Sequence, residues 1–497
     1  MISRRRFLKA GSAVALASLG GACRLSRQAV PGGVIVNDVH SQLNATEVRR
    51  VVNADSVAAL RDAVGCAAAE NVPVSIAGGR HAMGGQQFGT DMVLIDTSDM
   101  SRVVMFDTEN GLVEVEAGIR WPELIDYLLQ AQSGRQHSWG IVQKQTGADR
   151  LSVGGALAAN AHGRGLTYKP IVQDVESFVL IDAKGDAIRC SRDENPELFG
   201  LAIGGYGCFG AIATVTLRLG PRRKIERIVK VINIEELMPA FDWRIADGFV
   251  YGDFQFSIAN ESDDFLRRGV FSCYRPVDDD APMPEERAGM SNEDWMRLAY
   301  LTHVDKQQAF EVYSNYYLST SGQLYWSDTH QLSVYVDGYH EVLSRQMGEK
   351  SKGTELITEI YVPRDLLVTF MSRARDYLRD NDVSVIYGTI RLIEKDEECF
   401  LTLAREAWAC IIFNLHVPHL PEGMEHSRQA FLRLIDLAIE HGGSYFLTYH
   451  RFASRRQIEA CYPQFPEFLR LKRQYDPDER FQSDWYRHHR QMFADVL

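Results

Sequence analysis

Residues 76–85 read Ile-Ala-Gly-Gly-Arg-His-Ala-Met-Gly-Gly, and the predicted architecture is built outward from this loop. Two β-rich segments, 72–77 and 92–96, flank the loop, so we expect it to connect two strands. Glycine has no Cβ and accepts positive φ, which lets the backbone approach a ligand closely. Several N–H groups of such a loop can point at one diphosphate. A tight surface turn is the alternative for a loop of this kind taken alone.

The segments around the loop mix helices with strands. Apolar residues recur at helical spacing over residues 55–70, ahead of the first strand. Strand patterns return at 103–106 and 112–117, and residues 121–132 again have helical spacing. This part of the chain is therefore predicted to be α+β.

Two further glycine-rich segments follow. The second runs from Ser152-Val-Gly-Gly-Ala156 to Asn160-Ala-His-Gly163, and the third begins at Ile203 and ends at Gly210. Alternation of apolar residues predicts strands after each of them, at 175–182, 187–191 and 211–219. The predicted strands and the three glycine-rich segments together suggest one continuous ligand-binding domain.

The third segment contains Gly205-Tyr-Gly-Cys-Phe-Gly210, which matches the G-x-G-x-x-G dinucleotide fingerprint. That fingerprint must follow a strand and open a helix, so that the helix N-terminus meets the pyrophosphate. Here a predicted helix starting near Asn195 comes before it and a strand comes after it. The context argues against a nicotinamide dinucleotide site.

The composition changes after residues 220–224, where glycine becomes sparse, and we place a domain boundary there. Alternating residues predict strands around 254–256 and 332–336, each with one packed face. Residues 359–363 predict a strand that ends at a proline, and 364–379 an amphipathic helix.

Charge and cysteine spacing exclude some classes of function. The net charge of −12 argues against a nucleic-acid partner, because phosphate neutralisation needs a basic face. The eight cysteines form no Cys-x-x-Cys pair, so neither a metal site nor a redox dithiol is predicted. We expect most of them to be small buried hydrophobes.

The first residues have the layout of a signal peptide. Arg4-Arg-Arg-Phe-Leu-Lys9 precedes an apolar stretch over residues 10–22, too short to span a bilayer. The paired arginines resemble the twin-arginine export signal, which makes that translocon, a carrier of folded proteins, a predicted partner. Residues 1–30 are therefore predicted to be signal peptide and linker of a periplasmic or secreted protein without a stable transmembrane segment. Cys23 leaves a lipid anchor as the alternative to cleavage.

The order of the three glycine-rich segments resembles the FAD-binding half of the vanillyl-alcohol oxidase superfamily, which includes alditol oxidases, aldonolactone oxidases and berberine-bridge-like enzymes. The resemblance covers about residues 45–220 and returns at Tyr475-Asp-Pro-Asp-Glu-Arg-Phe481. It implies a two-subdomain FAD-binding domain over 40–220 and a substrate domain over 221–445 with a large antiparallel sheet flanked by helices. The C-terminal segment 446–497 is expected to return to the FAD-binding domain.

The resemblance implies that the glycine-rich segments bind FAD. His81 occupies the position whose ring nitrogen is bonded covalently to the flavin in many members, and a histidine that only contacts the cofactor is the alternative. Ser152 aligns with a serine near the reactive edge of the flavin and is a candidate catalytic residue. The predicted FAD-binding residues are Gly78, Gly79, Arg80, His81, Ala82, Met83, Gly84, Ser152, Gly154, Gly155, Asn160, His162, Gly163, Gly205 and Gly207.

Arg391 is the second candidate catalytic residue. It matches the arginine of a Ser-Glu-Ile-Arg motif in alditol oxidases, but the sequence here reads Gly388-Thr-Ile-Arg391, so Thr389 replaces the glutamate. A cation beside the substrate oxygen favours the developing alkoxide while hydride leaves. The alternative for Arg391 is a structural ion pair with Glu394 or another acid. Weaker candidates for the same pocket are Tyr387, His416 and His450.

These observations predict an FAD-dependent oxidoreductase that takes hydride from an alcohol, sugar, lactone or related small substrate. Oxygen, a quinone or a cytochrome would then reoxidise the flavin. Two alternatives stay open: a flavoenzyme of the same fold that oxidises an amine or other secondary metabolite, or reduces a double bond, and a binding protein with a vestigial flavin site.

Overall fold

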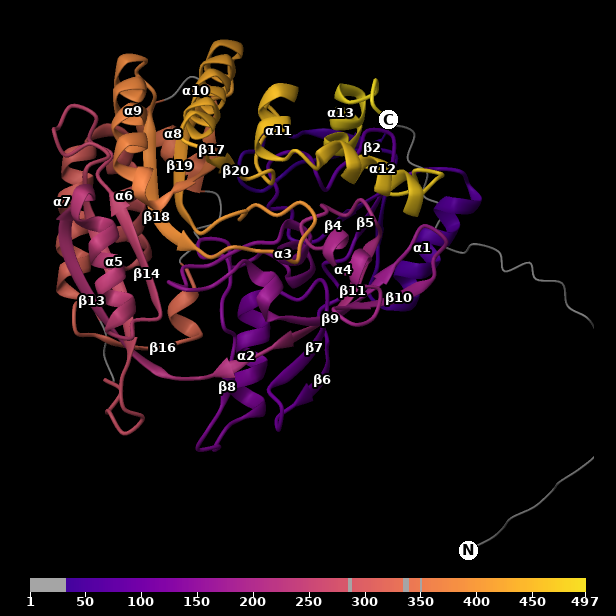
Figure 1. The fold of residues 1–497 in the computed structure, drawn as a ribbon, viewed down its shortest axis with the longest axis horizontal. Helices are drawn as coiled ribbons and strands as arrows, with labels where there is room; N and C mark the ends of the chain where they lie inside the picture. Colours follow the sequence, from indigo (N-terminus) through magenta and orange to yellow (C-terminus); the bar gives the residue numbers. More distant parts are fainter. Residues whose placement is uncertain (1–32, 285–287, 334–338, 349–350) are drawn as a thin grey trace, which may run out of the picture.

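The computed structural model describes residues 33–284, 288–333, 339–348 and 351–497. The chain forms two regions. The first, up to β12 at Gly220–Pro221, contains several small sheets, and the second, from β13 at Lys224 onward, is built on an eight-stranded sheet. Figure 1 shows the two regions side by side, with the last helices lying beside the first region. The predicted signal peptide, with Cys23, lies outside the described residues.

The first region begins with a small parallel sheet of strand order β3-β5-β4. Helix α1 starts where the Ser56 side chain accepts a hydrogen bond from the Ala59 N–H at 3.2 Å, and it buries its apolar face against the sheet. The elements are β1 (Val34–Val36), β2 (Thr46–Val48), β3 (Arg50–Asn53), α1 (Val57–Ala69), β4 (Val74–Ala77) and β5 (Val93–Asp96). Because β4 ends at Ala77, the loop of residues 78–92 leaves from the carboxyl end of this sheet.

The second part of this region is a five-stranded antiparallel sheet of order β10-β9-β11-β7-β6. Its strands are β6 (Val103–Asp107), β7 (Leu112–Glu116), β9 (Val175–Ile181), β10 (Ala187–Ser191) and β11 (Ala211–Arg218). Its helices are α2 (Trp121–Ala131), α3 (Val153–Ala159) and α4 (Pro196–Ala202). A Cβ on Gly154 would stand 2.6 Å from the Ala117 Cβ, so this glycine lets α3 pack closely beside the end of β7.

The second region is an antiparallel sheet of order β16-β13-β15-β14-β18-β19-β17-β20. Its strands are β13 (Lys224–Asn233), β14 (Tyr251–Phe256), β15 (Arg268–Pro276), β16 (Leu324–Trp326), β17 (Gly353–Pro363), β18 (Val385–Ile393), β19 (Trp408–Pro418) and β20 (Ser444–Tyr445). A further two-stranded pair, β8 (Trp139–Gly140) with β12 (Gly220–Pro221), precedes it. The predicted α+β class with a large antiparallel sheet is confirmed.

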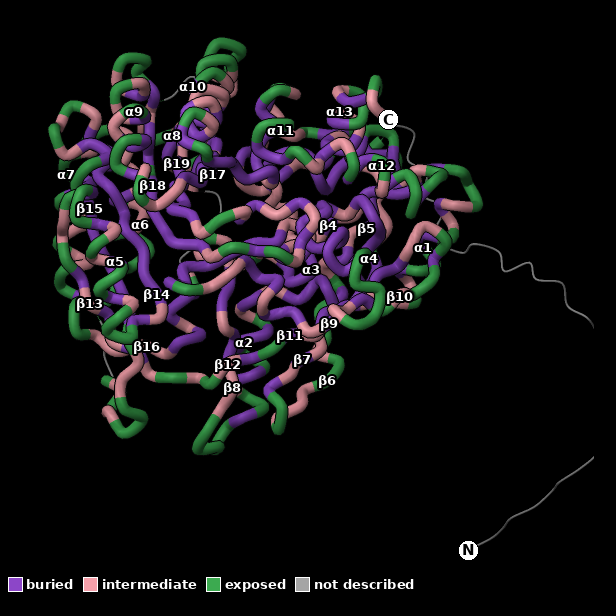
Figure 2. The backbone as a smooth tube through the Cα atoms, in the orientation of Figure 1, coloured by how far each residue is buried: buried purple, intermediate pink, exposed green. Residues whose placement is uncertain are grey.

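Helices flank this sheet. The apolar faces of α9 and α10 pack on β17, and Phe241 of α5 packs on Phe271 of β15. These helices are α5 (Leu237–Ala246), α9 (Leu367–Asp380) and α10 (Pro421–Glu440). The sheet also contacts α6 (Asn292–Val304), α7 (Lys306–Ser319) and α8 (Tyr339–Met347). In Figure 2 the buried backbone follows the sheet strands, and the exposed backbone follows the outer turns of the helices.

The C-terminal segment lies beside the small parallel sheet of the first region. After α11 (Arg455–Cys461), α12 (Phe465–Tyr475) leads to a bridge between Phe481 and Val74 of β4, and α13 (Asp484–Met492) follows. The buried Arg480 guanidinium donates to the Val72 carbonyl at 2.9 Å. The C-terminal segment therefore contacts the first region of the chain.

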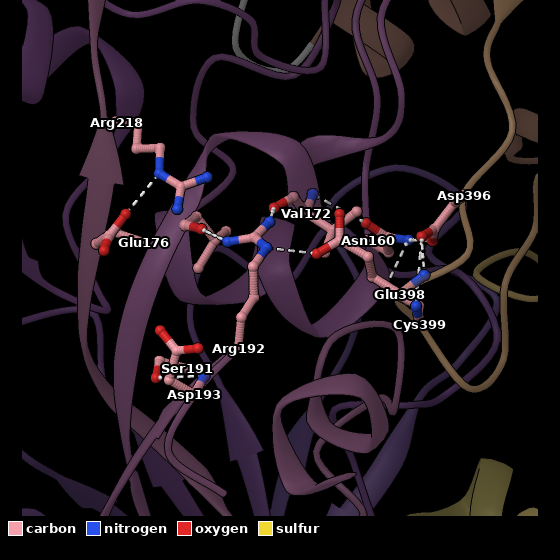
Figure 3. A network of polar contacts seen from close by, with 11 residues as sticks. Asn160, Val172, Glu176, Ser191, Arg192, Asp193, Arg218, Asp396, Glu398 and Cys399 are labelled. Atoms are coloured by element: carbon pink, nitrogen blue, oxygen red, sulfur yellow. Dashed lines mark hydrogen bonds and ion pairs between the residues drawn. The ribbon is translucent and has the colours of Figure 1, made fainter. Parts of the chain in front are cut away.

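A polar network fixes how the two regions meet (Figure 3). The Arg192 guanidinium donates to Glu398 at 2.6 Å and to the Val172 carbonyl at 2.9 Å. Glu398 lies in the loop between β18 and β19, so one arginine of the first region binds a loop of the second. This contact joins the two regions at that loop.

Two local predictions differ from the structure. The helix expected over 364–379 begins with a 3-10 turn at Arg364–Leu366, and α9 follows it. The strand expected around 332–336 lies mostly outside the described residues, and its described part, Leu332 and Ser333, is irregular because a 3-10 turn ends just before it. Within the described part of the chain, no helix combines the length and the hydropathy needed to cross a membrane.

Candidate active site

A cavity of about 840 Å³ lies where the glycine-rich segments face the sheet. Glycines from all three segments reach its wall: Gly78 and Gly79 from the first, Gly154 and Gly155 from the second, and Gly207 from the third. The opposite wall comes from the sheet and from α6, α7 and α8. A volume of this size fits an organic cofactor, and enzyme sites commonly lie at such domain interfaces.

The first glycine-rich segment packs closely against the beginning of the second. A Cβ on Gly78 would clash with the Ser152 side chain, and a Cβ on Gly79 would clash with the Arg150 carbonyl. Arg80, which follows these two glycines, has φ 57° and forms an ion pair with Asp96 at 2.6 Å. Only glycine allows this close approach, which brings two backbone segments to one side of the cavity.

His81 faces the cavity from this segment. Its Nδ1 lies 2.7 Å from His40 Nε2, so the two rings share a hydrogen bond. Its Nε2 is buried and has no hydrogen-bond partner among the described residues. Burial lowers the pKa of His81 well below its usual value, and the neighbouring His40 and Arg120 act in the same direction. The ring is therefore neutral at physiological pH.

The second and third segments form the rest of this wall. Ser152 precedes α3, and its Oγ accepts a hydrogen bond from the Gly155 N–H at 3.2 Å. Tyr206 and Gly207 both have positive φ, 53° and 73°, and the space in front of Gly207 is open where a Cβ would stand. The third segment lies after α4 and before β11, so the G-x-G-x-x-G match is not a Rossmann turn, as predicted.

Of the residues predicted to bind the cofactor, most line the cavity: Gly78, Gly79, Arg80, His81, Ala82, Met83, Ser152, Gly154, Gly155, His162 and Gly207. The exceptions are Gly84, Asn160, Gly163 and Gly205, which do not line the cavity. Asn160 ends α3 with φ 49°, and its amide donates to Asp396 at 2.9 Å (Figure 3). A Cβ on any of the three glycines would meet a neighbouring backbone carbonyl.

A buried network lies behind His162. The Glu359 carboxylate of β17 is 0% exposed and accepts hydrogen bonds from His162 Nε2 at 2.5 Å, Tyr361 at 2.5 Å, Tyr449 at 3.1 Å and Cys410 at 3.3 Å. Burial raises the pKa of Glu359, but His162 and the Tyr361 hydroxyl outweigh it, so the pKa lies below its usual value. The ligand atoms of His162, Glu359 and Cys410 lie within 4.8 Å of one another, close enough for a metal. Hydrogen bonding alone accounts for their arrangement.

The sheet presents a polar face to the cavity. Arg391 of β18 is 4% exposed, and its Nε and Nη1 atoms have no hydrogen-bond partner in the described part of the chain. Glu394, the structural partner considered for Arg391, binds Arg364 instead, at 2.7 Å. Asp253 and Gln255 of β14 line the same wall. Arg391 is therefore held at the cavity without the predicted alternative ion pair.

More polar groups follow along this face. Asn414 of β19 donates to Glu355 of β17 at 2.9 Å, and Tyr339 of α8 also donates to Glu355. Burial raises the pKa of Glu355. Tyr387 reaches the cavity, as predicted for a weaker candidate, whereas His416 and His450 are not in its wall. His450 stacks on Phe452 with ring centroids 5.1 Å apart, and burial lowers its pKa to about 4.

Sequence reasoning missed His40, Asp253, Gln255, Glu355 and Asn414. Asp253 and Gln255 alternate with Phe254 and Phe256, so the pattern identified a strand with one packed face. It did not show that the polar face of the strand lines a cavity, because the partner of that face lies far away in sequence. His40 precedes the first predicted helix and belongs to no motif.

Comparisons with known proteins identify the part of the chain with the first two glycine-rich segments as a cofactor-binding domain. A sequence profile of the FAD binding domain matches residues 48–191. An L-gulonolactone oxidase from Bos taurus is 29% identical over 188 residues, which are 38% of this chain and 41% of the relative. The L-galactono-1,4-lactone dehydrogenase 1, mitochondrial, from Oryza sativa subsp. japonica is 30% identical over 220 residues, 43% of this chain and 36% of the relative.

A longer alignment exists at lower identity. An L-gulono-1,4-lactone dehydrogenase from Mycobacterium tuberculosis (strain ATCC 25618 / H37Rv) is 23% identical over 441 residues, 88% of this chain and 95% of the relative. The chain therefore spans less than half of the first two relatives and nearly all of the third. These similarities confirm the predictions of an FAD-binding domain, of FAD as cofactor and of a resemblance to aldonolactone oxidases.

The residues present fit FAD. On the wall formed by the three glycine-rich segments, the space in front of Gly207 is open where a Cβ would stand. The backbones of all three segments meet at this wall. The buried, unpartnered Nε2 of His81 is one polar atom of this wall that no other described residue satisfies. Arg391 lines the same cavity from the sheet.

Proposed function

We propose that this chain, which carries an FAD-binding domain, is an FAD-dependent oxidase or dehydrogenase acting on the CH–OH group of a polyhydroxylated substrate, a sugar lactone or an alditol. The main observation that supports this function is the polar face of the sheet. It holds buried hydrogen-bond donors and acceptors that have no partner in the described part of the chain, and they lie opposite the wall formed by the glycine-rich segments. They are the Nε and Nη1 atoms of Arg391, the Oδ1 atoms of Asp253 and Asn414, and the Oε1 atom of Gln255, none with a hydrogen-bond partner among the described residues. A buried polar group without a partner is unfavourable, so a ligand rich in hydroxyl groups fits this face.

The relatives support the same substrate class. Those in Bos taurus, Oryza sativa and Mycobacterium tuberculosis are named for L-gulonolactone, L-galactono-1,4-lactone and L-gulono-1,4-lactone. A neutral sugar lactone offers several hydroxyl groups and a carbonyl, which match the mixed donors and acceptors of the face. The replacement of a glutamate by Thr389 argues that the hydroxyl contacts differ from those of the alditol oxidases.

When bound, FAD supplies the hydride acceptor. The chain positions the substrate, because the polar residues of the sheet line the cavity on the side opposite the glycines. Arg391 donates to the substrate oxygen and stabilises the negative charge that develops as the C–H bond breaks. His162, held by Glu359, fixes the wall at the junction of the two regions.

We further propose that a ring nitrogen of His81 would be bonded to the methyl carbon of the flavin's dimethylbenzene ring in place of one hydrogen. The displaced proton would be lost to solvent, and the two electrons would pass to the flavin ring and from it to the electron acceptor. His81 Nδ1 is engaged with His40, so Nε2 is the ring nitrogen available for the bond. The neutral state of the ring supports this role, because a protonated imidazole has no free lone pair. A covalent cofactor also suits an exported protein, which has no cytosolic supply of FAD.

Export through the twin-arginine translocon into the periplasm or beyond completes the proposal, on the strength of Arg4-Arg-Arg-Phe-Leu-Lys9. The terminal electron acceptor is oxygen, a quinone or a cytochrome. These acceptors are separated by measuring reoxidation of the reduced protein with each of them in turn.

The test of the function is anaerobic reduction of the purified holoprotein by L-gulono-1,4-lactone, L-galactono-1,4-lactone, D-sorbitol, simple primary alcohols and primary amines. We expect the flavin absorbance to bleach with one or more of the polyhydroxylated compounds. Bleaching by amines alone, or by none of the panel, contradicts the proposal.

A further inference from the structure

The sheet register places a carboxylate next to Arg391. Strands β14 and β18 are antiparallel and pair through Phe254 and Ile390. One residue away from that pair, Asp253 lies opposite Arg391. Side chains directly opposite each other in an antiparallel pair point to the same face, with Cβ atoms about 4.5–5.5 Å apart. Both side chains line the cavity.

Both groups are buried and have unused hydrogen-bonding atoms. Asp253 is 2% exposed, and its Oδ1 has no hydrogen-bond partner in the described ranges. Its Oδ2 accepts from Gln255 Nε2 at 3.3 Å and lies 3.6 Å from Arg164 Nη1. Arg391 has two unused donor nitrogens. The cavity wall therefore holds one free carboxylate oxygen beside free guanidinium donors.

We propose that Asp253 and Arg391 bind one hydroxyl group of the substrate between them. The Asp253 Oδ1 atom accepts the hydroxyl hydrogen, and the Arg391 guanidinium donates to the hydroxyl oxygen. A hydroxyl is both donor and acceptor, so it satisfies both side chains at once. This inference rests on the proposed function and identifies the residue that makes the protein select a hydroxyl group at this position.

The alternative acceptor is Thr389, which stands where alditol oxidases have glutamate. Thr389 is 0% exposed and is not in the cavity wall. Its Oγ1 is also buried without a hydrogen-bond partner among the described residues, so Thr389 is tested below as the competing acceptor. The carboxylate that this segment lacks is supplied from the neighbouring strand by Asp253. A carboxylate is a stronger acceptor than a threonine hydroxyl, which favours Asp253 further.

The experiment measures binding to the dithionite-reduced holoprotein by anaerobic calorimetry, because the reduced protein cannot oxidise its ligand. The probes are L-gulono-1,4-lactone, L-galactono-1,4-lactone, D-sorbitol and xylitol, each with analogues that lack a single hydroxyl. The proteins are the wild type, Asp253→Asn, Thr389→Val and the exposed control Asp242→Asn. FAD content and the visible spectrum of every variant are recorded first, so that a loss of cofactor is not counted as a loss of affinity.

We expect Asp253→Asn to weaken the parent probe about ten- to a hundredfold, the usual range for a hydrogen bond to a charged group. One deoxy analogue should bind the wild type equally weakly, and Asp253→Asn should weaken that analogue no further. Thr389→Val and Asp242→Asn should bind like the wild type.

The inference alone is overturned by unchanged affinity of Asp253→Asn for the parent probe, or by a loss of affinity in Thr389→Val that matches the deoxy analogue. The deoxy analogues are measured on the wild type, so they test the inference even if Asp253→Asn folds poorly. If removing each single hydroxyl group in turn leaves binding to the wild type unchanged, the inference is wrong. If no probe binds the wild type at all, the proposed function itself fails.

Discussion

Replacing Glu359 by glutamine should destabilise the junction between the two regions. The change keeps the size of the side chain and removes the charge of a carboxylate that accepts four hydrogen bonds, from His162, Tyr361, Tyr449 and Cys410. A hydrogen bond to a charged group is worth about 1 kcal/mol more than a neutral one. Allowing for bonds that are not independent, we expect a loss of about 2–3 kcal/mol in the free energy of unfolding.

The assay is urea unfolding of the holoprotein, monitored by protein fluorescence. Wild type and Glu359→Gln are compared with the same dependence of the unfolding free energy on urea concentration. The matched control is Glu355→Gln, four positions earlier on β17. Burial raises the pKa of Glu355, so its charged form is disfavoured and its replacement should cost less. A destabilisation of Glu359→Gln no larger than that of Glu355→Gln would refute the reasoning.

The stability difference between wild type and Glu359→Gln should also depend on pH. The pKa of Glu359 in the folded protein lies below its ordinary value of 4.5, so the unfolded state binds the proton more tightly. The carboxylate therefore stabilises the fold fully above about pH 4.5, and this contribution is lost as the pH falls through the folded pKa. The stability difference between wild type and Glu359→Gln should shrink in that range. A difference that stays constant down to acid unfolding contradicts the charge argument.

Three further predictions concern the cofactor and the chemistry. His81→Ala should leave no flavin in the acid-precipitated protein, whereas the wild-type pellet stays yellow; a yellow variant pellet places the bond elsewhere. Arg391→Met should lower kcat/KM about a hundred- to a thousandfold at unchanged FAD content, as for the loss of one donor to a developing oxyanion, while Glu394→Gln should leave it unchanged; steady-state kinetics of both variants decide this. Gly207→Val should weaken FAD binding, because valine disfavours φ 73° and its side chain enters the cavity, and flavin content per protein after purification checks it.

The first wall of the site could be predicted because its determinants are local. The approach of Gly78 to Ser152 and of Gly79 to the Arg150 carbonyl depends on the absence of a Cβ, and glycine is visible in the sequence. The order of a helix before Gly207 and a strand after it was also readable, which is why the misleading G-x-G-x-x-G match could be set aside. Gly163 and Gly205 pack on backbone carbonyls outside the cavity, yet the sequence pattern around them is the same.

The second wall could not be predicted in the same way. Whether Asp253 faces solvent or a cavity depends on the pairing of β14 with β18, which are more than a hundred residues apart in sequence. Arg391 was found only through a motif, and its neighbour across the sheet belongs to none. The His40 and His81 contact likewise joins two loops whose approach depends on the whole first region.

The most direct test of the account is the FAD content of the purified full-length protein, measured by visible absorbance and by release of the flavin after proteolysis. We predict a yellow protein with stoichiometric FAD, because backbone segments near His81, Gly155 and Gly207 meet at one cavity. A colourless protein that takes up no added FAD would contradict the claim that these segments bind a single dinucleotide.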